Sequence, residues 1–102
     1  MELITRPRFY LDIVEEVEYL ARKADSETAE RWHKALDQTI RQLLRHPEIG
    51  RQRTDLQPAG TRSWHVNRFR RWLIFYALRE NALVLLRVRY GMLDLPALEF
   101  EP

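Results

Sequence analysis

Residues 72–78 (WLIFYAL) form an unbroken apolar run, and this run restricts the fold more than any other segment of the chain. Side chains on both faces of a strand made from it are apolar, so the strand must be covered on both sides. Residues 79–81 (REN) follow as a turn, and residues 83–90 (LVLLRVRY) supply the second arm of a hairpin. The run therefore predicts a central strand with an antiparallel neighbour.

Two amphipathic helices are expected before this hairpin. The first starts at Pro7 with Thr5 or Arg6 as its cap, and its acidic residues fall largely on the face opposite its apolar stripe. That stripe contains Tyr10, Ile13, Val14, Val17, Leu20, Ala21 and Ala24. The second starts at Asp25-Ser26 and ends at Pro47. Its stripe contains Ala29, Trp32, Leu36, Ile40 and Leu43.

The remaining segments complete the predicted order of elements. Leu3 and Ile4 form a short apolar strand ahead of the helices, residues 47–61 form a loop, and residues 62–66 alternate as a short strand. Helices and a sheet with apolar faces must bury those faces against each other. We therefore expect an α+β fold, in which an antiparallel helical hairpin packs on a small, mainly antiparallel sheet, with residues 1–102 as one domain.

The composition narrows the possible environments and chemistries. A chain of 102 residues suits one domain, and the absence of cysteine excludes disulfides and thiolate chemistry. No run of about 18 apolar residues is present, and the first ten residues do not have the pattern of a signal peptide. The expected location is the cytoplasm.

Charge is divided unevenly along the chain. Residues 9–37 hold eight acidic and four basic residues, a net charge of −4, whereas residues 41–71 hold eight arginines and two acids, a net charge of +6. Arginine forms forked hydrogen bonds with carboxylates and phosphates. The basic half therefore indicates an anionic partner, either an acidic protein segment or a nucleic acid, although a solvated arginine-rich surface would look the same.

Motifs for catalysis, phosphate binding or metal binding are not visible. The chain has no glycine-rich phosphate loop and no nucleophile elbow, and its three histidines, His33, His46 and His65, are far apart in the sequence. We therefore expect no cofactor, no metal and no catalytic residue.

Two arginine-containing segments are the candidate binding sites. Arg87 and Arg89 follow Leu83 and Leu85 on the same predicted strand face, which would form an amphipathic groove for an apolar helix with acidic flanks. The alternative is that the strand simply runs out of the core into water. In residues 67–72 (NRFRRW), arginines alternate with aromatic residues, a pattern found at single-stranded nucleic-acid sites and also in basic hairpins whose aromatics point into the core.

Four segments carry a resemblance to a known family. They are residues 46–51 (HPEIGR), 60–64 (GTRSW), 73–76 (LIFY) and 86–96 (LRVRYGMLDLP). With the order of elements, they resemble the ParE/RelE toxin superfamily, and within it the ParE branch, over nearly the whole chain. The last segment is the most specific, although Tyr90 stands where the family often has histidine and Leu93 where it often has arginine.

The resemblance implies a toxin of a type II toxin–antitoxin pair. ParE-like members poison DNA gyrase, whereas the RelE branch cleaves mRNA on the ribosome with basic residues and a tyrosine near the C-terminus. Here Leu73 stands at the position of the in-strand arginine of RelE, and the tail after Gly91 begins Met-Leu-Asp-Leu-Pro. The residues that the RelE branch uses for cleavage are therefore not supplied at the matching positions. The gyrase-binding toxin is therefore preferred, with an mRNA interferase or a non-toxic binding module of the same fold as alternatives.

The expected partners are DNA gyrase and a cognate antitoxin with an acidic amphipathic segment, in a toxin–antitoxin hetero-oligomer; direct binding to nucleic acid is the less favoured interaction, and no membrane partner is expected. The candidate target or antitoxin contacts are Arg62, Arg68, Arg70, Arg71, Arg87, Arg89, Tyr90 and Asp94.

Overall fold

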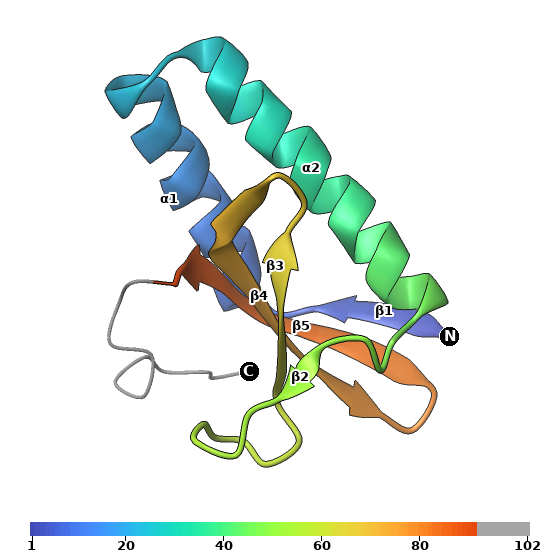
Figure 1. Ribbon diagram of the computed structural model, residues 1–102. Coiled ribbons are helices and arrows are strands. Elements are labelled where there is room, and N and C mark those ends of the chain that lie inside the picture. The colour runs from blue at the N-terminus through green and yellow to red at the C-terminus, as the bar shows by residue number, and fades with distance from the viewer. Residues whose placement is uncertain (92–102) are drawn as a thin grey trace.

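The computed structural model describes residues 1–91 and has the predicted α+β fold. Its elements are β1 (Glu2–Thr5), α1 (Pro7–Lys23), α2 (Ser26–Arg45), β2 (Arg51–Gln52), β3 (Arg62–Val66), β4 (Phe69–Arg79) and β5 (Ala82–Tyr90). The sheet order is β1-β5-β4-β3-β2, with β1 parallel to β5 and the other pairs antiparallel. The helical hairpin packs on one side of this sheet (Figure 1). The family-like segment after Gly91, with Asp94, lies outside the described residues.

The helix boundaries follow the signals in the sequence. Pro7 occupies the first turn of α1 after Arg6, and the Asp25 carboxylate caps α2 by accepting a hydrogen bond from the Thr28 backbone N–H at 2.6 Å. The predicted apolar stripe of α2 is confirmed, because Ala29, Trp32, Leu36 and Leu43 are buried and Ile40 packs against the same cluster. No helix among residues 1–91 is long and apolar enough to cross a membrane.

The buried face of α1 differs from the prediction. Tyr10 and Val14 are 59% and 54% exposed, whereas Asp12 and Glu16, expected on the outer face, are buried. The physical reason is that α1 packs against β5 as well as α2, and the charged and polar groups near the end of β5 require acceptors there. The predicted stripe of α1 is therefore rotated, and part of it faces solvent.

Strand β4 lies at the centre of the sheet and is covered on both faces, as predicted. On the helix side, Ile74 and Tyr76 pack with Trp32, Leu36 and other residues of the main core. On the opposite side, Phe75 and Ala77 pack with Leu56, which comes from the loop that follows β2 rather than from a helix. The segment of residues 47–61, predicted as a loop, contains one short strand, β2, that the sequence did not predict.

A β-bulge changes which face the end of β5 presents. Leu83 and Leu85 lie on the helix side, but the register with β4 shifts between Phe75 and Tyr76, so Leu86 has no direct partner. Val88 then joins Leu83 and Leu85 in the main core. The prediction that Arg87 and Arg89 share a face with Leu83 and Leu85 is therefore wrong.

The loop after α2 is attached to the sheet through Tyr76. Its buried hydroxyl donates to the Pro47 carbonyl at 2.7 Å and accepts from the Gly50 N–H at 2.9 Å. Arg62 adds two hydrogen bonds, to the carbonyls of Glu48 and Gly50. A Cβ atom on residue 50 would lie 2.7 Å from the Tyr76 ring, so this position requires glycine.

Candidate functional site

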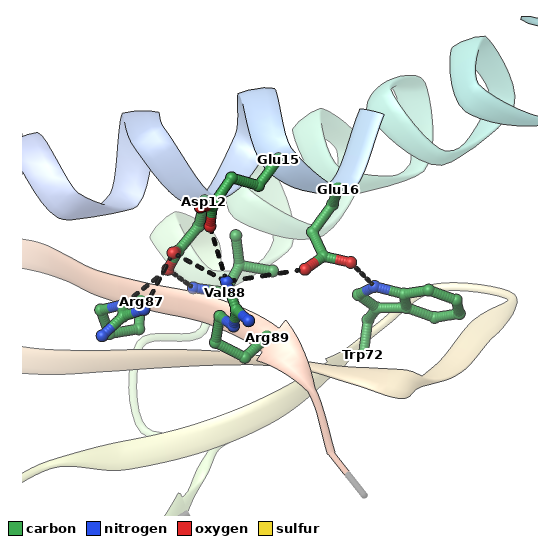
Figure 2. Close-up of polar contacts among 7 residues, drawn as sticks. All are labelled: Asp12, Glu15, Glu16, Trp72, Arg87, Val88 and Arg89. Atoms are coloured by element: carbon green, nitrogen blue, oxygen red, sulfur yellow. Dashed lines mark hydrogen bonds and ion pairs between the residues drawn. The ribbon is translucent and has the colours of Figure 1, made fainter. Parts of the chain in front are cut away.

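Arg87 is buried at the junction of α1 and β5, in an ion pair with Asp12. Its Nε donates to Asp12 Oδ2 at 2.7 Å and its Nη2 to Asp12 Oδ1 at 3.0 Å, a forked arrangement (Figure 2). The two side chains are only 3% and 1% exposed. Asp12 Oδ2 also accepts the backbone N–H of Val88 at 3.1 Å. The charge of Arg87 is therefore neutralised inside the protein.

Arg89 lies next to this pair and is also surrounded by carboxylates of α1. Its Nη1 is 2.8 Å from Glu15, 3.4 Å from Asp12 and 3.9 Å from Glu16 (Figure 2). The Arg89 side chain is 22% exposed, so it lies partly at the surface while it is paired with these carboxylates. An acidic ligand at Arg89 would have to compete with the acidic residues of α1.

Glu16 is a buried carboxylate held by an indole. Its Oε1 accepts a hydrogen bond from Trp72 Nε1 at 2.7 Å, and the Trp72 ring makes edge contacts with Trp32, Phe69 and Tyr90. Burial raises the pKa of Glu16 above its ordinary value of 4.5, although the Trp72 hydrogen bond and the charge of Arg89 act in the opposite direction.

Replacing Glu16 with glutamine is expected to remove a pH dependence of stability. A raised pKa means that the folded state holds the proton more tightly, so the free energy of unfolding falls as pH rises from about 4.5 through the pKa of the folded state. Glutamine keeps the acceptor for Trp72 and does not titrate. Urea unfolding measured across this pH range should show a smaller decrease in the free energy of unfolding for Glu16→Gln than for the wild type. The exposed Glu18→Gln is the control and should retain the wild-type slope.

A cavity of about 730 Å³ opens beside these residues, between α1 and the ends of β4 and β5. Trp72, Tyr90 and Leu20 supply apolar wall, while Arg22 and Lys23 lie at the C-terminal end of α1. Three glutamates of α1 also line the cavity, so its wall combines aromatic surface with side chains of both charges. Arg22 and Lys23 make no ion pair within residues 1–91, so an apolar side chain with an acidic group near the C-terminal end of α1 is the ligand that such a site would take.

The β3–β4 hairpin presents the other basic surface. Arg68, Arg70 and Arg71 are exposed there, and no carboxylate among residues 1–91 lies within ion-pair distance of them. Arg71 Nη1 is 3.2 Å from the Tyr90 hydroxyl. The turn at the hairpin is held to α2 by a hydrogen bond from the Asn67 N–H to the buried Thr39 hydroxyl, at 2.9 Å. We call Arg68, Arg70 and Arg71 the hairpin arginines.

The aromatic residues of this hairpin face inward. Phe69 and Trp72 pack against the main core. Of the two interpretations of residues 67–72, this agrees with a basic hairpin whose aromatic residues point into the core. His65 stacks on Trp64, and burial together with the charge of Arg70 lowers the pKa of His65. The exposed part of the hairpin is therefore mainly a positive electrostatic surface.

The structure divides the predicted contact residues into three groups. Arg62 supports the loop after α2, while Arg87 and Arg89 are paired with acids of α1. The third group is the exposed hairpin arginines, of which Arg71 contacts the Tyr90 hydroxyl. The sequence reasoning missed Asp12 and Glu16; their spacing of one helical turn was visible, but nothing local indicated buried partners. No cluster that could hold a metal ion is present among residues 1–91.

Comparisons with known proteins support the fold and identify the family. A solved structure described as the chromosomal ParDE TA system from P. aeruginosa is similar in fold, with a TM-score of 0.75 and 14% identity, over 88% of this chain and 95% of that chain. A search of curated proteins found no match. The family model for the ParE toxin of the type II toxin–antitoxin system parDE matches residues 3–94. The chain therefore belongs to the ParE toxin family.

Proposed function

We propose that this protein is the toxin of a cytoplasmic type II toxin–antitoxin module, that it inhibits DNA gyrase by binding it, and that a cognate antitoxin neutralises it. Membership of the ParE toxin family supports this proposal most directly. A binding mechanism also fits arginines whose roles are ion pairing and surface charge rather than proton transfer.

The hairpin arginines are the contacts that we propose for the target. They are exposed and lack acidic partners in the described part of the chain, whereas Arg87 and Arg89 are paired internally. Exposed charges of one sign accelerate encounter with an oppositely charged surface, and salt weakens their effect. Inhibition should therefore decrease as ionic strength rises.

For the antitoxin we propose the cavity beside Trp72 and Tyr90. Apolar side chains of an amphipathic segment would pack on this aromatic wall, and acidic flanking residues would contact Arg22 and Lys23. This placement revises the expectation that Arg87 and Arg89 hold the acidic flanks, because α1 already supplies their carboxylates.

A supercoiling assay with purified gyrase tests the function. The wild-type protein should inhibit supercoiling, and antitoxin should restore it. The double variant Arg70→Glu/Arg71→Glu should raise the concentration required for inhibition by about tenfold or more, because like charges at an interface are repulsive. The matched control is Arg41→Glu/Arg45→Glu, which reverses two exposed arginines of α2.

Unchanged supercoiling in the presence of the wild-type protein would exclude the gyrase mechanism. Ribosome-bound mRNA, incubated with the same preparation, distinguishes the alternatives. Cleaved message would identify an interferase, whereas intact message together with normal growth on expression would identify a non-toxic binding module.

A further inference from the structure

The cavity beside α1 and the hairpin arginines adjoin each other, although the proposed function assigns them to different partners. Trp72 and Tyr90, which line the cavity, are direct cross-strand partners in the register of β4 and β5, with ring centroids 4.9 Å apart. Arg71 immediately precedes Trp72 in the chain, and its Nη1 is 3.2 Å from the Tyr90 hydroxyl. The aromatic wall of the antitoxin cavity therefore ends at a guanidinium that is assigned to the target.

Charged side chains of both signs line the cavity, and some of them already have partners. Glu15 and Glu16 lie within ion-pair distance of Arg89, at 2.8 and 3.9 Å. The lining charges that make no ion pair within residues 1–91 are Glu18, Arg22 and Lys23. Arg71 is exposed and has no carboxylate partner among the same residues, since its contact is the Tyr90 hydroxyl. Acidic groups of a ligand therefore find cationic partners at the C-terminal end of α1 and at Arg71.

An occupant of the cavity would cover Arg71 as well. An α-helix with its side chains is about 10–12 Å across. The Arg71 guanidinium lies only 3.2 Å from the Tyr90 hydroxyl, which is well within that width. A helix whose apolar side chains pack on Trp72 and Tyr90 would thus lie over the guanidinium, and its acidic side chains could take the N–H donors that the target requires.

The structure favours covering of the hairpin over movement of the hairpin. Its turn is fixed to α2 by the hydrogen bond from the Asn67 N–H to the buried Thr39 hydroxyl. Trp72, on the same strand, is held by the hydrogen bond to Glu16 and by edge packing against Trp32. A ligand can only shift an equilibrium between states that the protein adopts, and a hairpin fixed at these two points offers little for a ligand to shift.

We infer that the antitoxin neutralises the toxin by direct competition with the target, and that Arg71 is the residue that both partners contact. The inference rests on the proposed function, in which the cavity binds the antitoxin and the hairpin arginines bind gyrase. Because two macromolecules cannot occupy the same surface, the binding of one excludes the other without any change in the shape of the toxin. A complex that contains all three proteins through one toxin molecule does not form.

Surface plasmon resonance with immobilised DNA gyrase tests the competition. Toxin bound to gyrase should be released as purified cognate antitoxin is added. The apparent Kd of the toxin for gyrase should rise in proportion to the antitoxin concentration, without reaching a plateau. A ternary complex, detected as added mass when antitoxin is injected over bound toxin, would overturn the inference.

Charge reversals in the toxin identify the shared contact. Arg71→Glu should weaken binding to gyrase and binding to the antitoxin, each by about tenfold or more, because like charges at an interface repel each other. Arg68→Glu is the matched control, since it makes the same change three residues away, about 10 Å along an extended strand, and should weaken only gyrase binding. Arg22→Glu/Lys23→Glu should weaken only antitoxin binding. Circular dichroism should show all three variants folded.

The results separate this inference from the proposed function. If Arg71→Glu lowers the affinity for only one partner, or if Arg68→Glu weakens antitoxin binding as much as Arg71→Glu does, the inference is wrong and the proposed function stands. If the wild-type toxin does not bind gyrase before any antitoxin is added, the proposed function is wrong, and the inference with it.

Discussion

Replacing Asp12 with alanine is expected to lower the free energy of unfolding by about 3–5 kcal/mol, because it leaves the buried Arg87 guanidinium without its carboxylate. The same change removes the acceptor of the Val88 backbone N–H. Urea unfolding monitored by circular dichroism measures the loss. Asp37→Ala, at an exposed position of α2, should change stability by less than about 0.5 kcal/mol.

A double substitution separates the ion pair from general damage to the core. In Asp12→Leu/Arg87→Met both charges are absent, and apolar residues often replace a buried ion pair at little cost. The double variant should therefore be more stable than Asp12→Ala alone. If the free energy of unfolding of Asp12→Ala is within about 1 kcal/mol of the wild-type value, the buried Arg87 does not require the Asp12 carboxylate.

Replacing Trp32 with alanine is expected to destabilise the protein by about 3–5 kcal/mol, since the side chain is fully buried and its loss opens a large cavity. Trp32 also packs edge-on against Trp72, with ring centroids 6.5 Å apart. In the alanine variant, Trp72, which donates a hydrogen bond to Glu16, should therefore lose its fixed position. Thermal unfolding and the near-ultraviolet circular dichroism of the tryptophans measure the two effects.

Trp32→Phe is the informative comparison at this position. The indole Nε1 of Trp32 is buried and has no hydrogen-bond partner within residues 1–91, so phenylalanine removes no such bond and keeps most of the ring. Its loss of stability should be well below that of the alanine variant. Equal losses for both variants would show that the indole makes a contribution that ring packing does not explain.

Local patterns predicted most of the fold. The cap at Asp25, the buried stripe of α2 and the doubly covered strand β4 each depend on residues close in sequence, and the structure confirms them. Strand β2 was missed because its two residues pair only with β3 and carry no apolar pattern of their own.

The candidate site was harder to predict because its determinants are far apart in the sequence. Asp12 is buried because it pairs with Arg87, which lies 75 residues later in the sequence. An analysis of helical periodicity places every carboxylate on the solvent-facing side of the helix. The bulge at Leu86 reverses the alternation of β5 just before Arg87. A single inserted residue of this kind has no sequence signature, so the arginines were assigned to the wrong face.

The position of Asp12 also limits how the sheet can grow. Beyond Leu85, α1 rather than a strand lies beside β5, and Asp12 takes up the Val88 amide that a neighbouring strand would otherwise bind. The outer strand on this side is thus only the four residues of β1, and on the other side only the two residues of β2. Short edges offer little template for another extended chain, which should protect a protein with such an apolar central strand from sheet-mediated aggregation.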